Sequence, residues 1–115
     1  MEKGLEDSDF VRVCSVDEVL EGEPRPFAVE GADDADRVLV RDGADIFSLG
    51  RICSHQGADL SEGVASAGVL WCPLHSSGFD LRSGTALHPP ASEPVPVYRV
   101  RIENGDVYVS VRPKA

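Results

Sequence analysis

The sequence predicts an all-β fold, built as a small antiparallel sandwich or barrel. Short apolar runs recur about every 8–12 residues, with Gly, Pro, Asn or Asp between them. The clearest signal is Asn104-Gly105, which stands between two runs of alternating apolar and polar residues and is typical of a hairpin turn. No internal repeat, low-complexity tract or linker divides the 115 residues, so we expect a single domain over residues 1–115.

The strands follow from apolar runs and alternation. Residues 69–71 and 79–81 are expected as short segments that lead into and out of one loop, and Ser83-Gly84 is expected as a turn. The other expected strands are residues 10–13, 27–29, 38–40, 46–49, 97–102 and 107–111.

One short helical turn is expected, because Ser15 and Glu18 have the spacing of a capping box that opens a turn through Leu20. A second turn is expected at Asp42-Gly43, between two strands. The remaining segments are predicted without regular structure: residues 1–9 as a frayed end, residues 31–36 as an exposed acidic loop, and residues 87–96, with four prolines, as a stiff extended loop without pairing.

The net charge of −9 lies entirely in the first 45 residues, which hold 14 Asp or Glu against 5 Lys or Arg. The remaining residues hold 6 of each sign. Such a balance makes nucleic acid a poor partner. The acidic surface is expected to serve solubility, and steering toward a basic redox partner is the alternative that we keep open.

The chain is expected to be cytoplasmic and not membrane-bound. No apolar run approaches the roughly 20 residues needed to cross a bilayer, and the acidic first residues contain no apolar signal segment. The three cysteines agree with a reducing compartment. Cys14 ends the first expected strand and is interpreted as a small, half-buried thiol.

Two pairs of possible metal ligands stand out, Cys53-x-His55 and Cys72-x-x-His75, separated by sixteen residues. Each pair spans one tight turn, so the four side chains can converge on one site. Zinc is one interpretation, but zinc fingers normally pair Cys with Cys and His with His. One Cys and one His in each loop instead suit a [2Fe–2S] cluster, whose irons take two Cys and two His respectively.

With the continuations His-Gln-Gly-Ala and Ser-Ser-Gly-Phe-Asp-Leu, these pairs resemble the Rieske [2Fe–2S] ferredoxins over residues 10–111. The resemblance implies a Rieske-type sandwich or barrel with a cluster-binding subdomain in loops at about residues 51–90. It implies one [2Fe–2S] cluster per chain, with Cys53 and Cys72 on the buried iron and His55 and His75 on the outer iron. The family's third loop, which covers the cluster, is similar to residues 89–91.

The reduction potential is expected near the low end of the Rieske range, about −150 mV. Ala58 and Leu74 occupy the positions where high-potential relatives have a disulfide, and Phe79 occupies that of a hydrogen-bonding tyrosine. Ser77 matches a serine that donates to a sulfide. Asp59, where ferredoxins often have proline, is expected to place a negative charge beside the first loop and to lower the potential further.

The neighbours of the motif are expected to serve packing. Trp71 and Phe79 should keep water from the buried iron. Three glycines should allow close approaches or unusual dihedrals: Gly57, Gly63 and Gly78. His88, the third histidine, is expected to be exposed near the cluster loops, and a chain with three histidines cannot also supply the mononuclear iron site of a Rieske oxygenase large subunit.

The resemblance implies an electron carrier without an active site of its own. It would pass single electrons from a flavoprotein NAD(P)H-dependent ferredoxin reductase to a terminal Rieske non-haem iron oxygenase. Two alternatives remain open at this point: the small subunit of an assimilatory nitrite reductase, and an electron donor in iron–sulfur cluster assembly.

Overall fold

The computed structural model describes residues 9–32, 35–54, 57–73, 77–88 and 93–114. Within these residues the chain forms strands and two 3-10 turns, and no helix is long and apolar enough to span a membrane. In chain order the elements are β1 (Phe10–Ser15), η2 (Val16–Glu18), β2 (Arg25–Ala28), β3 (Asp36–Asp42), β4 (Asp45–Gly50), η3 (Leu60–Glu62), β5 (Val64–Ser66), β6 (Val69–Trp71), β7 (Gly78–Asp80), β8 (Ala86–His88), β9 (Val97–Glu103) and β10 (Asp106–Pro113).

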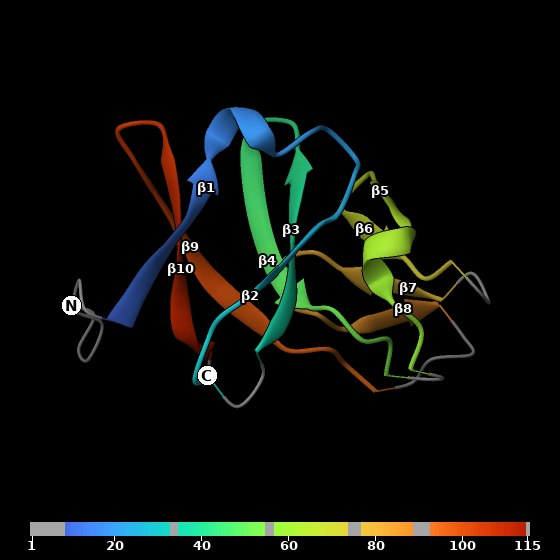
Figure 1. Ribbon diagram of the computed structural model, residues 1–115. Helices are drawn as coiled ribbons and strands as arrows, with labels where there is room; N and C mark the ends of the chain where they lie inside the picture. Colours follow the sequence, from blue (N-terminus) through green and yellow to red (C-terminus); the bar gives the residue numbers. More distant parts are fainter. Residues whose placement is uncertain (1–8, 33–34, 55–56, 74–76, 89–92, 115) are drawn as a thin grey trace.

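Two antiparallel sheets make up the molecule (Figure 1). The larger sheet has the strand order β1-β10-β9-β4-β3-β2, and the smaller sheet has the order β5-β6-β7-β8. The smaller sheet lies to one side of the larger one (Figure 1). The second cysteine-containing loop connects its strands β6 and β7, and the first lies between β4 of the larger sheet and η3. The predicted all-β antiparallel architecture with a cluster-binding subdomain is therefore confirmed.

The core divides at the larger sheet. One cluster of buried residues lies between the two sheets and joins Val38 and Val40 of β3 to Leu70 of β6 and Phe79 of β7. The second lies on the other face and includes Leu39, the residue between those two valines. Because successive residues of a strand point to opposite faces, β3 is buried on both sides, which explains its uninterrupted apolar run.

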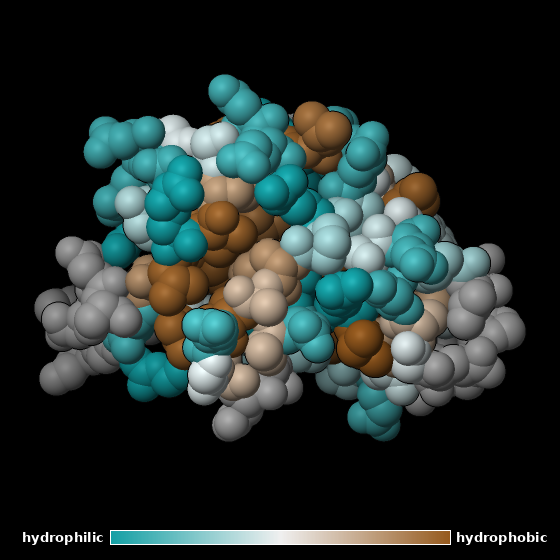
Figure 2. Space-filling view, in the orientation of Figure 1, coloured by the Kyte–Doolittle hydropathy of each residue, from teal (hydrophilic) through white to brown (hydrophobic). Residues whose placement is uncertain are grey.

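The second core is only partly covered. Figure 2 shows hydrophobic residues between hydrophilic ones on the side where β1 and β2 face the viewer. The residues that pack against this core while keeping some exposure are Val13, Val16, Phe27 and Val100. The larger sheet therefore curls around an apolar interior without sealing it completely along its two edge strands.

Most predicted elements are confirmed, with small shifts at their ends. The β9–β10 hairpin turns at Asn104-Gly105, where both residues have positive φ as this turn requires. The β3–β4 turn is formed by residues 43–44, one residue later than predicted, because Gly43 supplies its positive φ. The capping box of Ser15 and Glu18 is present, and the turn it opens ends at Glu18 instead of Leu20.

Three expectations were wrong. Residues 60–62 form a second 3-10 turn, η3, where only one helical turn was predicted, and residues 64–66 form strand β5. Residues 86–88 form β8 within a segment that was predicted to be unpaired from residue 87 onward. Leu87 and His88 precede the first proline of that segment, so their amides remain able to pair with β7.

Candidate metal centre

The two predicted sulfur ligands are buried in the same apolar core. Cys53 is 2% exposed and Cys72 is 5% exposed, and both belong to the cluster between the two sheets. Neither forms a disulfide. Their neighbours in that cluster include Leu60 and Leu70, which are fully buried. The thiols are therefore held in a dry environment on the inner side of the two loops.

The two loops close in the same way. The backbone N–H of Cys53 donates to the carbonyl of Ala58, and the N–H of Cys72 donates to the carbonyl of Ser77, both at 2.8 Å. In each case a cysteine is bonded to the residue five positions ahead. One predicted histidine lies between the two bonded residues of each loop in the sequence. The two halves of the motif are therefore closed by the same kind of backbone hydrogen bond.

The structure brings together only part of the predicted site. His55 and His75 lie outside the described residues, as do Leu74 and the predicted covering loop at residues 89–91. In the part of the chain that the structure describes, no three His, Cys, Asp or Glu side chains gather as metal ligands. The structural support for the site therefore comes from its two sulfurs and their loops.

Packing around the loops agrees with the expectation for Phe79 but not with that for Trp71, which lies outside the core that holds the two cysteines. Phe79 is fully buried between the sheets, so its ring excludes water and it has no hydroxyl to donate. Ser77 is also buried, directly after the second loop. Trp71 is half-buried on the opposite face of the smaller sheet, where its ring centroid lies 4.7 Å from that of His88.

Trp71 and His88 belong to one cross-strand row. Register pairs Val64 with Trp71, Trp71 with Gly78, and Gly78 with His88 across all four strands of the smaller sheet. A Cβ on Gly78 would lie 2.7 Å from Nδ1 of His88 and 3.1 Å from the Trp71 ring. Gly78 therefore leaves room for the two rings to meet, and His88 is exposed as predicted.

The other two glycines also have the expected roles. Gly57 has φ of +72°, and its N–H donates to the carbonyl of Cys53 at 3.0 Å within the first loop. A Cβ on Gly63 would lie 1.9 Å from the carbonyl oxygen of Trp71, so any side chain there would collide with backbone. Both glycines thus allow the backbone conformation or close approach that the segments next to the two cysteines require.

The expectation for Asp59 needs correction. Its carboxylate accepts two hydrogen bonds from the guanidinium of Arg51, from Nε at 2.9 Å and from Nη2 at 2.8 Å. The Arg51 hydrogen bonds, followed by those from Ser61, hold the pKa of Asp59 well below its usual range. The charge near the first loop is a balanced ion pair instead of a lone anion, so the predicted lowering of the potential by Asp59 does not follow.

Arg51 was missed by the sequence analysis, since nothing in the spacing of an Arg and an Asp on either side of a cysteine marks a pair. Cys14 also differs from expectation. It is 3% exposed in the second core, on the far side of the larger sheet, and burial raises the pKa of its thiol. Cys14 is thus fully buried instead of half-buried.

The donor chemistry fits an iron–sulfur group. Two thiols in matching loops can each provide a thiolate, and the apolar wall around them keeps water away from such ligands. A small all-β domain with two such loops has the features of a protein that can hold a metal or a cluster through its cysteines.

Comparison with known proteins identifies the family. Residues 9–99 match the model of the Rieske [2Fe–2S] domain, and the chain belongs to this family. Its cofactor is therefore a Rieske-type [2Fe–2S] cluster. The chain is 39% identical over 97 residues to the anthranilate 1,2-dioxygenase ferredoxin subunit of Burkholderia cepacia, which covers 84% of this chain and 87% of that relative.

Two solved structures extend the comparison. The ferredoxin fold in a complex of reduced oxygenase and oxidized ferredoxin of carbazole 1,9a-dioxygenase matches with a TM-score of 0.85 at 28% identity, over 95% of this chain and 99% of that chain. A putative NADH-dependent nitrite reductase small subunit from Mycobacterium tuberculosis matches with a TM-score of 0.73 at 24% identity, over 92% and 95%. The second similarity concerns the fold alone.

Proposed function

We propose that this protein is a one-electron carrier that delivers electrons to a terminal Rieske non-haem iron oxygenase. The observation that carries the proposal is the 39% identity, over most of both chains, to a protein named as a dioxygenase ferredoxin subunit. The fold similarity to the ferredoxin in an oxygenase–ferredoxin complex supports it. A flavoprotein NAD(P)H-dependent reductase is the electron donor in this proposal.

Cys53, His55, Cys72 and His75 are the cluster ligands in this proposal. The burial of both cysteines and the matching closure of their loops support the assignment of the sulfurs. The histidines are assigned from the motif, in which each loop contributes one thiolate and one imidazole. The cluster, when bound, takes up and releases a single electron.

The chain's own residues would orient and shield the ligands. Phe79, Leu60 and Leu70 belong to the same buried cluster as the two cysteines and would keep water away from them. The backbone hydrogen bonds of Cys53 and Cys72 fix each cysteine at the start of its loop. Because the relative that matches over most of both chains is named as a ferredoxin subunit, the protein supplies electrons in this proposal and the oxygenase performs the chemistry.

Iron and sulfide analysis tests the ligand assignment. Purified protein should hold about two irons and two labile sulfides per chain. Cys53→Ala and Cys72→Ala should each lose nearly all of both, while Cys14→Ala, a change at the cysteine in the other core, should keep them. Full iron in Cys53→Ala, or one zinc in place of iron in the unaltered protein, would contradict the assignment.

The role of His75 is tested by the reduction potential. Replacing an imidazole by a thiolate adds a negative charge to the site, so His75→Cys should lower the potential wherever the cluster is retained. His88→Cys is the matched control, because His88 lies on the outer face of the sheet against Trp71. An unchanged potential in His75→Cys would remove this residue from the ligand set.

The partner assignment is tested with reduced protein as bait in extracts of the native host. A carrier of this kind should capture an oxygenase and a reductase weakly and reversibly, because small interfaces suit redox encounters. Stoichiometric co-purification with a large nitrite reductase subunit, or with cluster-assembly proteins, would favour one of the alternatives. Oxygenase turnover that depends on this protein would settle the choice between them.

A further inference from the structure

The stems of the two ligand loops differ in their backbone support. The second loop is carried by the β6–β7 hairpin, in which three consecutive residue pairs are in register. The first loop stands on one isolated bridge, between Ile52 and Asp59. Next to that bridge are the Cys53–Ala58 hydrogen bond and a 2.7 Å bond from the N–H of Leu60 to the carbonyl of Arg51. The first loop therefore lacks the ladder that aligns the second.

A side-chain ion pair joins the two sides of this weaker stem. Arg51 and Asp59 form two parallel N–H···O bonds, the geometry in which a guanidinium and a carboxylate interact most strongly. Asp59 also accepts from the N–H of Ser61 at 2.9 Å and from its hydroxyl at 2.6 Å, which caps η3. Arg51 lies two residues before Cys53, and Asp59 directly follows Ala58, whose carbonyl accepts the hydrogen bond from the N–H of Cys53.

We propose that Arg51 and Asp59 are positioning residues for the cluster. Their ion pair holds the two ends of the first ligand loop together, and the opposite charges of the two side chains cancel beside the site. The inference rests on the proposed cluster ligands. The side chains of both partners are about one-third exposed, so water screens the pair only in part.

The proposal predicts shifts of opposite sign. Reduction adds a negative charge to the site, so an uncompensated anion nearby disfavours it and an uncompensated cation favours it. Arg51→Gln leaves Asp59 unpaired and should lower the potential. Asp59→Asn leaves Arg51 unpaired and should raise it. The double variant restores neutrality, and its potential should return close to that of the unaltered protein.

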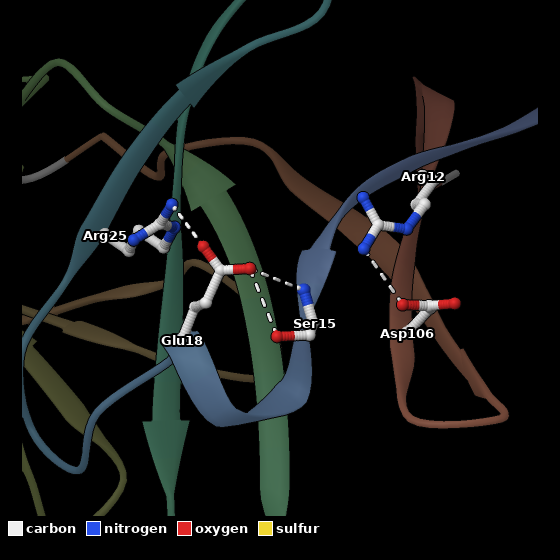
Figure 3. Close-up of polar contacts among 5 residues, drawn as sticks. All are labelled: Arg12, Ser15, Glu18, Arg25 and Asp106. Atoms are coloured by element: carbon white, nitrogen blue, oxygen red, sulfur yellow. Dashed lines mark hydrogen bonds and ion pairs between the residues drawn. The ribbon is translucent and has the colours of Figure 1, made fainter.

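A second ion pair provides matched controls. Arg12 on β1 and Asp106 on β10 are 3.0 Å apart, in the larger sheet and away from β7 and β8 (Figures 1 and 3). Arg12→Gln and Asp106→Asn change the net charge of the protein by the same amounts as the test variants. Their potentials should stay at the value of the unaltered protein, which separates a local effect from one of overall charge.

Iron release to a chelator gives the second measurement. Both single variants at the stem should release iron faster than the unaltered protein and the Arg12→Gln control, because one side of the loop is no longer tied. Shifts of the same sign in Arg51→Gln and Asp59→Asn, or release rates equal to the control, would overturn the proposal. Absence of iron from the unaltered protein would instead overturn the proposed function, so the two failures are distinguishable.

Discussion

At Gly63 a single missing side chain decides whether two elements can meet. The residue ends η3 with φ of −87°, a value open to any amino acid, so its backbone conformation does not require glycine. The requirement comes from the carbonyl oxygen of Trp71, only 1.9 Å from where a Cβ would stand. Because Trp71 precedes Cys72, this contact links η3 to the second ligand loop.

Gly63→Ala should therefore destabilise the protein by about 3 kcal/mol, since backbone must move to relieve the overlap. Chemical denaturation measures the loss, and iron content should fall with it. Gly68→Ala is the control: its φ of +80° carries a strain of about 1 kcal/mol, but nothing lies within 4 Å of the added Cβ. Equal losses in both variants would refute the close-contact explanation.

At the scale of elements, the turn between β7 and β8 depends on one carboxylate. Asp80 accepts hydrogen bonds from the N–H of Arg82 at 3.1 Å, the N–H of Ser83 at 2.8 Å and the hydroxyl of Ser83 at 2.9 Å. The N–H of Gly84 closes the same turn on the Asp80 carbonyl at 2.8 Å. Asp80 thus fixes the direction in which the chain leaves the turn to form β8, and with it the position of His88 on that strand.

Asp80→Ala should cost about 1–2 kcal/mol of unfolding free energy, because three hydrogen bonds to a charged group in a partly exposed turn are lost. The stacking of Trp71 on His88 should loosen with it, which tryptophan fluorescence can follow. Asp45→Ala is the matched control, since the Asp45 side chain is 64% exposed and its ion pair with Arg82 is long, at 3.7 Å. A fluorescence change of the same size in the control would contradict this prediction.

At the scale of the whole molecule, a buried arginine ties together distant parts of the larger sheet. Arg37 on β3 is fully buried and donates to the carbonyls of Ser110 and Val111 on β10, both at 2.6 Å. Its guanidinium lies 3.7 Å from the ring centroid of Tyr98 on β9. Two strands, β4 and β9, separate β3 from β10 in the sheet, so this side chain crosses the interior of the curl.

Arg37→Met should lower the free energy of unfolding by about 2–4 kcal/mol, because carbonyls near Ser110 lose charged donors that a thioether cannot replace. The curl of the sheet should loosen, and hydrogen exchange in β10 should speed up more than in β6. Arg82→Ala, at a side chain that is 74% exposed, should change the stability by less than about 0.5 kcal/mol. If Arg37→Met had the same free energy of unfolding as that control, the role of Arg37 in joining β3 to β10 would be refuted.

Acid should unfold the protein through its bonded carboxylates. Hydrogen bonds hold the pKa values of three carboxyl groups below their ordinary range. The donor to Glu18 is the backbone N–H of Ser15, the donor to Asp59 is the guanidinium of Arg51, and the donor to Asp80 is the hydroxyl of Ser83. A carboxyl whose pKa is lower in the folded state contributes stability above its unfolded pKa of about 4, and that stability is lost as the pH falls through the folded value.

Unfolding free energy should accordingly decline as the pH falls below about 5, and the decline should be shallower in a Glu18→Gln, Asp59→Asn, Asp80→Asn triple variant. Denaturant titrations at a series of pH values measure both slopes. Equal slopes in the two proteins would show that other groups control the acid transition.

The sequence by itself determined the strand pattern, the β9–β10 hairpin and the two Cys-His loops, because alternation, Asn104-Gly105 and close ligand spacing are local properties of the chain. It also predicted close approaches or unusual dihedrals at Gly57, Gly63 and Gly78, but only the structure shows which atoms a Cβ at positions 63 and 78 would meet. Only the tertiary structure decided that Asp59 is neutralised by Arg51 and that Arg37 crosses the sheet interior to β10. Those contacts join residues that become neighbours only when the chain folds, and no local pattern of residue types records which charge will face which.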